Sequence, residues 1–149
     1  LWTPMHAEES ALWSLDRKDG MEKAYCCFNS NARDFARFGQ LLLNNGQWDD
    51  RQLISPAYLA EATSPDTRLV YKDLGKPNHC YGFQYWILDY KGMKIPYMRG
   101  ILGQYVFTLP EKNAVIVRLG HKRSDTYTAD QHYPDDINTW LDAAMDLLQ

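Results

Sequence analysis

The stretch YMRGILGQYVFTLPEKNAVIVRLGHK, residues 97–122, decides the fold of this 149-residue protein. Two apolar runs, 104–109 and 114–120, are separated by the polar residues 110–113. Their valine, isoleucine and aromatic content and the four-residue turn between them predict an antiparallel β-hairpin. Because residues 115–117 are apolar one after another, we expect the second strand to be covered on both faces.

Three other segments have the composition of strands. The segment 81–90, YGFQYWILDY, is aromatic and β-branched, and we expect a strand over its length. Its aromatic residues would alternate between the core and a face that could line a substrate groove: Tyr81, Phe83, Tyr85 and Trp86. Residues 10–16 and 22–28 predict a strand pair around the turn signal Asp19-Gly20.

Two helices are predicted from their capping residues. In the segment 30–46, Ser30 or Asn31 can accept hydrogen bonds from the first free backbone N–H groups. The residues 44–46, Asn-Asn-Gly, favour the left-handed conformation that closes a helix. A second, short helix begins after Ser55, with proline in its first turn.

A C-terminal helix beginning near Pro134 has a wide apolar stripe. Its apolar residues recur at spacings of three and four: Ile137, Trp140, Leu141, Ala144, Met145 and Leu148. Before the three central strands, the polar residues 64–80 predict a long surface connection. The element order predicts one α+β domain over 1–149, an antiparallel sheet packed by the C-terminal amphipathic helix.

Composition excludes several functional classes. The net charge of −3 is spread over both signs, and the one basic cluster, 121–123, is too small for a nucleic-acid-binding surface. No apolar run approaches the ~20 residues of a membrane span, and there is no signal-peptide pattern. Adjacent Cys26 and Cys27 fit disulfide geometry badly, so we expect three buried thiols or one bond to Cys80. His79 beside Cys80 makes a metal site conceivable, but no C-x-x-C spacing supports it.

Three motifs in this order, followed by the amphipathic helix, resemble the C-terminal half of the penicillin-recognising, β-lactamase-like serine hydrolases. The motifs are NARDFARFGQLLLNNGQW (31–48), YGFQYWI (81–87) and RGILGQYVFTLPEKNAVIVRLG (99–120). The resemblance covers nearly the whole chain. It is greatest to class C β-lactamases, related esterases and 6-aminohexanoate-dimer hydrolases, and it implies the C-terminal part of the β-lactamase/transpeptidase-like fold.

The chemistry that this resemblance implies is acyl transfer to a serine from a small-molecule ester, amide or β-lactam. A lysine and a tyrosine manage the proton of the serine hydroxyl, which is a poor nucleophile without a neighbouring base. Backbone N–H groups hold the developing oxyanion, and no metal or cofactor takes part. The resemblance also implies export to the periplasm.

The resembled family carries a Lys-Thr-Gly or His-x-Gly triplet on the strand that lines its active site. The matching residues here are Met98, Arg99 and Gly100. The resemblance therefore makes the backbone N–H of Ile101 one donor of the oxyanion hole. Gly100 would let an acyl group approach the backbone, and Gly103 would tighten the turn.

Met98 stands where the family has a cation, and Arg99 follows one place on. An arginine could grip a substrate carboxylate in a bidentate pair, and with Gln104 it is a candidate substrate contact. This departure weakens the expectation of β-lactam recognition and favours an esterase or a short-chain amide hydrolase. The alternative is a glycine-rich hairpin turn with a solvated arginine.

The sequence contains neither Ser-x-x-Lys nor Tyr-x-Asn, and its first residue is Leu1. In the resembled family both motifs precede the matched region. We therefore expect a C-terminal fragment that carries one wall of an active site, has the remainder of the parent chain as its partner and is inactive alone. The rival expectation is a non-catalytic binding or structural module that retains the sheet.

Other polar residues have simpler structural explanations. Arg118 interrupts an apolar strand and predicts a pair with a carboxylate, and His121 suits a polar strand end. Asp34, with Arg33 and Arg37, predicts helix capping and i,i+4 pairing.

Overall fold

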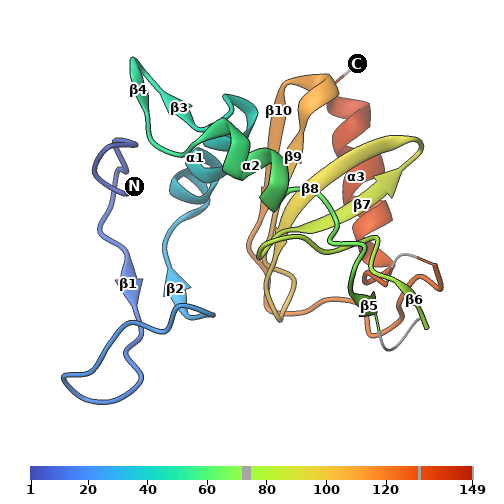
Figure 1. Ribbon diagram of the computed structural model, residues 1–149, viewed down its shortest axis with the longest axis horizontal. Coiled ribbons are helices and arrows are strands. Elements are labelled where there is room, and N and C mark those ends of the chain that lie inside the picture. The colour runs from blue at the N-terminus through green and yellow to red at the C-terminus, as the bar shows by residue number, and fades with distance from the viewer. Residues whose placement is uncertain (72–74, 131, 149) are drawn as a thin grey trace.

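The main sheet is antiparallel and four-stranded, in the order β10-β9-β8-β7 (Figure 1). The computed structural model describes residues 1–71, 75–130 and 132–148. The strands of this sheet are β7 (Trp86–Tyr90), β8 (Met93–Arg99), β9 (Tyr105–Leu109) and β10 (Ala114–Arg118). The predicted hairpin is confirmed: β9 and β10 pair with Phe107 opposite Ile116, and the short helix η1 (Pro110–Lys112) joins them.

One face of this sheet is packed by the C-terminal helix α3 (Asp136–Leu147). Ile137 and Leu141 of α3 are fully buried. They pack against side chains that alternate along the strands: Leu88, Tyr90, Ile95, Tyr97, Tyr105, Phe107 and Leu109. Two residues of the predicted apolar stripe, Trp140 and Leu148, are exposed. The face of α3 that packs on the sheet is therefore narrower than predicted.

The opposite face of β9 and β10 is covered by helix α1 (Ala32–Leu43). The Asn31 side chain caps α1 by accepting the Asp34 N–H at 2.8 Å, which decides between the two predicted caps. A Cβ at Gly39 would lie 2.5 Å from a Val115 methyl carbon, so the helix backbone approaches the strand closely. Val115 faces α1 and Ile116 faces the α3 side, which confirms that β10 is covered on both faces.

The region between α1 and β7 contains helix α2 (Pro56–Ala62) and two short ladders. The ladders are β3 (Gln47–Trp48) with β4 (Arg51–Gln52), and β5 (Val70–Tyr71) with β6 (Lys76–Pro77). The second ladder lies in the predicted long connection 64–80, of which residues 72–74 lie outside the described residues. Buried Asn78 ties this connection down by donating to the Tyr81 carbonyl at 2.5 Å and the Asp66 carbonyl at 3.2 Å.

The predicted strand over 81–90 is confirmed only for β7, and its first half was wrong. The Gly82 N–H donates to the Tyr85 carbonyl at 2.8 Å, and Gln84 has φ +64°, so the chain turns before β7 begins at Trp86. The four aromatic residues of this segment therefore do not alternate along a single strand.

The prediction of three central strands was also wrong, because β8 is a fourth. Lys91 and Gly92 have φ of +52° and +88°, the left-handed pair of a two-residue hairpin turn. This turn returns the chain from β7 into β8. The sequence signal was the alternation of Met93, Ile95 and Tyr97, which face the core beside α3.

The predicted N-terminal strand pair is confirmed, although its strands are short. β1 (Leu12–Trp13) pairs antiparallel with β2 (Phe28–Asn29) in an arm that extends away from the main sheet (Figure 1). The Phe28 ring packs edge-on against Trp2 and Trp13, with centroids 5.1 and 5.5 Å away. This aromatic cluster continues to Phe35 and Phe38 of α1, which anchors the arm.

The structure corrects the cysteine prediction. Cys26 and Cys27 are bonded to each other across one peptide unit, with Cα atoms 3.7 Å apart. Cys80 is a free thiol and is 1% exposed. Burial raises the pKa of the Cys80 thiol, which keeps it protonated and unreactive near neutral pH.

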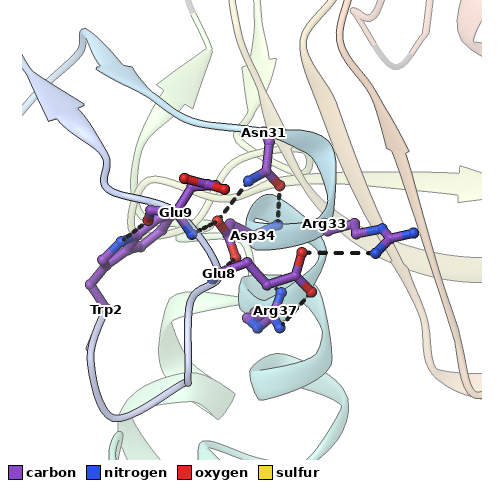
Figure 2. Close-up of polar contacts among 7 residues, drawn as sticks. All are labelled: Trp2, Glu8, Glu9, Asn31, Arg33, Asp34 and Arg37. Atoms are coloured by element: carbon purple, nitrogen blue, oxygen red, sulfur yellow. Dashed lines mark hydrogen bonds and ion pairs between the residues drawn. The ribbon is translucent and has the colours of Figure 1, made fainter.

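The predicted role of Asp34 is corrected: Asn31 caps α1, and Asp34 pairs with Arg37 at i,i+3 and binds the N-terminal segment (Figure 2). Its buried carboxylate accepts the N–H groups of Glu8 and Glu9 at 2.8 and 3.1 Å. Asn31 and Arg37 donate to the same carboxylate at 2.8 and 2.9 Å. Burial opposes ionisation of Asp34, but these hydrogen bonds and the Arg37 charge outweigh it and lower the pKa. The carboxylate thus fastens the N-terminal segment to the start of α1.

Candidate functional site

The turn 100–104 reverses the chain between β8 and β9. The Gly100 N–H donates to the Gln104 carbonyl at 2.7 Å, and the Gly103 N–H donates to the Gly100 carbonyl at 3.4 Å. Gly103 has φ +83°, and a Cβ there would overlap the Arg118 guanidinium. Glycine at position 103 is therefore required both by the backbone conformation and by the space available.

The N–H of Ile101 points out of the turn. The Gly100 carbonyl faces inward, because it accepts the Gly103 N–H, and a trans peptide directs the next N–H the opposite way. Among the described residues, none accepts a hydrogen bond from the Ile101 N–H. Residue Ile101 is 80% exposed. The turn thus contains a backbone donor that the described residues leave unused.

Arg99 lies on the α3 side of the sheet, at the end of β8. Its guanidinium carbon is 3.3 Å from the centre of the Trp86 ring on β7. Its Nη1 donates to the His132 carbonyl at 2.9 Å and to the Tyr97 hydroxyl at 3.4 Å. Burial raises the pKa of Tyr97, and the Arg99 charge opposes that rise. Arg99 is therefore half-buried and stacked, not a solvated side chain.

Gln104 and Met98 lie on either side of the turn. Gln104 Oε1 accepts the Gly120 N–H at 2.9 Å, which links the turn to the end of β10. Met98 is paired with Val106 on the face of β8 opposite to Arg99, because neighbouring strand residues alternate between faces. The structure thus brings Arg99, Ile101 and Gln104 to one end of the sheet, with Met98 turned to the other side.

Two surface cavities lie elsewhere on the sheet. One, of about 390 Å³, is beside the β7–β8 turn at Lys91 and Gly92. The other, of about 430 Å³, is lined by Lys76, His79 and Lys94 among others. Neither of these two cavities is lined by any residue of 98–104.

Arg118 does not pair with a carboxylate in the described part of the chain, contrary to the prediction. Its Nη1 donates to the Gly103 carbonyl at 2.5 Å and its Nη2 to the Lys122 carbonyl at 2.8 Å. His121 is exposed, as expected for a polar strand end. Buried Tyr105 lies near Arg118, and burial raises its pKa to about 12, which Arg118 opposes.

Within the described ranges, no three His, Cys, Asp or Glu side chains gather as they would around a metal ion. No helix in the same ranges is both long and apolar enough to cross a membrane.

Comparison with known proteins relates the fold to a hydrolase. A solved structure described as "Putative 6-aminohexanoate-dimer hydrolase from Bacillus anthracis" superposes with a TM-score of 0.67 at 26% sequence identity. The match covers 95% of this chain and 34% of the other, so this chain spans about a third of that protein. No family model and no curated protein matches.

The similarity is to a hydrolase of the β-lactamase-like family. It confirms the predicted α+β fold, with antiparallel sheets and a C-terminal helix, as similar to the C-terminal part of a β-lactamase-like fold. For activity, it supports a resemblance to a β-lactamase-like hydrolase at the level of the family.

Proposed function

We propose that this chain is the C-terminal portion of a β-lactamase-like serine hydrolase. The parent protein would cleave an ester, amide or β-lactam bond through an acyl-serine intermediate, without a metal or cofactor. The serine, lysine and tyrosine of that chemistry would lie outside these 149 residues, which contain neither Ser-x-x-Lys nor Tyr-x-Asn. The chain itself would contribute the sheet, the terminal helix and one donor of the oxyanion hole.

The observation that carries this proposal is the outward N–H of Ile101. A catalytic oxyanion donor must be free of other acceptors and fixed before the substrate arrives. The Ile101 N–H has no acceptor among the described residues, and hydrogen bonds between Gly100, Gly103 and Gln104 hold its turn. Removal of one such donor typically lowers kcat by about 10²–10³.

Arg99 and Gln104 are proposed to contact the substrate beside this donor. The described residues use only Nη1 of Arg99 as a hydrogen-bond donor, which leaves its Nε and Nη2 available to a carboxylate. Gln104 uses its Oε1 to accept the Gly120 N–H, so its amide NH₂ is available as a donor. The Cβ sides of Gly100 and Gly103 are filled by the Gln104 and Arg118 side chains, so a substrate would have to approach the turn from the side of the Ile101 N–H. With Met98 in place of the family cation, this arrangement favours esters or short-chain amides over β-lactams.

Labelling with acyl probes tests the proposal. The 149-residue chain and the complete protein encoded by the gene would each be treated with a fluorescent penicillin and a fluorophosphonate. We expect labelling of the complete protein alone, and no turnover of a chromogenic cephalosporin or of p-nitrophenyl esters by the 149-residue chain. Serine-dependent turnover by the 149-residue chain, abolished by an acylating inhibitor, would overturn the proposal.

The role of Arg99 has its own test in the complete protein. Arg99→Ala should reduce turnover of carboxylate-bearing substrates more than turnover of neutral ones, because only the former lose an ion pair. Arg68→Ala is the matched control, since Arg68 is exposed and pairs with Asp66. An equal loss for both substrate classes would remove Arg99 from substrate binding.

The alternative is a non-catalytic binding or structural module. It is favoured by the existing contacts of Arg99 with Trp86 and His132, and by the position of both cavities away from the turn. The coding sequence upstream of Leu1 discriminates between the two. Ser-x-x-Lys followed by Tyr-x-Asn would support the hydrolase, and an upstream sequence without them would support the module.

A further inference from the structure

Arg118 lies in a socket formed by two glycines next to the turn 100–104. A Cβ at Gly103 would overlap its guanidinium, and one at Gly120 would lie 2.5 Å from Nη1 and 2.7 Å from the guanidinium carbon. The Trp140 ring of α3 lies 4.7 Å from the same carbon. Only glycine at both positions leaves room for the planar cation.

The guanidinium of Arg118 bridges two segments of backbone. Its two terminal nitrogens bind the carbonyls of Gly103 and Lys122, one on each segment. No Asp or Glu in the described ranges forms an ion pair with it. The planar fork of an arginine reaches two carbonyls at once, which the single ammonium of a lysine does not reproduce.

Arg123 holds the same turn by a different carbonyl. Its Nε donates to the Ile101 carbonyl at 3.1 Å and its Nη1 to the Ser124 carbonyl at 2.7 Å. Its guanidinium carbon lies 5.0 Å from the centre of the Tyr127 ring. Arg118 and Arg123 therefore bind alternate carbonyls of the turn from the segment at the end of β10.

We propose that Arg118 and Arg123 are positioning residues that fix the outward orientation of the Ile101 N–H. They form an arginine clasp on the turn. Because Gly100 and Gly103 give this turn wide conformational freedom, bonds to its carbonyls are needed to keep one orientation. The two cations also favour negative charge beside the turn, as an oxyanion requires. The catalytic purpose of this orientation rests on the proposed function, whereas the contacts of the clasp do not.

Amide NMR of the 149-residue chain tests the clasp without any activity. The variants are Arg118→Lys, Arg123→Lys and Gly120→Ala, which fills the socket while Arg118 remains. Arg68→Lys is the control, since Arg68 lies in the connection before β7 and pairs with Asp66.

In the three clasp variants, the amide resonances of Ile101, Leu102 and Gly103 should shift. Hydrogen exchange of the Gly100 N–H should become at least about tenfold faster, because its bond to Gln104 opens locally. The amides of Ile95 and Phe107, fully buried in the same sheet, should not change, and the control should match the wild type.

Two results would overturn the clasp: unchanged turn amides, or changes at Ile95 and Phe107 as large as those in the turn. If Arg118→Lys does not fold, Gly120→Ala and Arg123→Lys carry the test. If the turn amides shift in the 149-residue variants but no acyl probe labels the complete protein, the clasp is retained and the proposed function is removed. If the turn amides are unchanged but the complete protein is labelled, the function is retained and the clasp is removed.

Discussion

The guanidinium carbon of Arg99 lies 3.3 Å from the centre of the Trp86 ring, so the cation at the end of β8 stacks on the first residue of β7. The Tyr81 ring also packs against the Trp86 ring, with the two ring centroids 4.7 Å apart. These contacts join the two strands at the end of the sheet that carries the turn 100–104. Arg99 is therefore held by the sheet before any ligand binds.

A double-mutant cycle on Arg99 and Trp86 should reveal this stacking. The substitutions Arg99→Gln and Trp86→Leu, alone and together, should give a coupling of about 0.5–2 kcal/mol in the free energy of unfolding, as expected for a cation–π pair. Urea denaturation of the four proteins measures it. Additivity to within about 0.3 kcal/mol would show that the contact does not stabilise the fold.

Gly103→Ala and Gly92→Ala should differ in effect although both glycines have positive φ, +83° and +88°. A Cβ at Gly92 meets no atom within 4 Å, so its substitution costs only the backbone strain of about 1–2 kcal/mol. A Cβ at Gly103 also displaces Arg118, and the loss in unfolding free energy should be larger. Equal losses in chemical denaturation would contradict the crowding at Gly103.

Leu141→Ala and Leu147→Ala compare two leucines of the same helix. Leu141 is 0% exposed and Leu147 is 87% exposed. Truncating the buried side chain leaves a cavity under the sheet and should cost about 2–5 kcal/mol, whereas truncating the exposed one should cost less than about 0.5 kcal/mol. Similar unfolding midpoints for the two variants would argue against α3 packing on this face.

Asp34→Asn should destabilise the protein at neutral pH, because an amide presents hydrogens to backbone N–H groups that need an acceptor. The folded-state pKa of Asp34 is lowered. Its ionised form therefore stabilises the fold above the unfolded value of about 3.9, and this stabilisation is lost as the pH falls through the lower folded pKa. The difference in Tm between wild type and Asp34→Asn, several degrees at pH 7, should shrink below about pH 4. A constant difference would assign the effect to packing.

Thiol titration should find one reactive cysteine of the three. With Cys26 and Cys27 bonded to each other, only Cys80 reacts with Ellman's reagent after unfolding without reductant. Burial should protect Cys80 in the folded protein. Three reactive thiols in the unfolded, unreduced chain would show that the adjacent pair is not bonded.

The elements that could be predicted are those specified by neighbouring residues. The caps Asn31 and Ser55, the asparagine-glycine end of α1 and the β9–β10 hairpin all depend on contacts within a few positions. The missed strand β8 was less evident, because it contains Pro96, a residue that lacks a backbone N–H and is depleted in strands. Its pairing with both β7 and β9 compensates for this weak local preference.

For the candidate site, the sequence indicated a glycine turn beside Arg99, and the family resemblance implied a donor at Ile101. The direction of that N–H depends on which carbonyl bonds inside the turn, and this became clear only from the folded backbone. Arg118 looked like one half of an ion pair, yet the fold places it between Gly103 and Gly120.

From its sequence alone, the protein could be assigned to the α+β class, because periodicity and capping act over short distances. Its motifs resemble those of β-lactamase-like hydrolases. Tertiary structure decided the remaining contacts. It determined which arginine stacks on Trp86, which arginines bind the turn, and which segment Asp34 holds. These contacts join residues 13 to 33 positions apart, or cross between strands, and their geometry exists only once the sheet has formed.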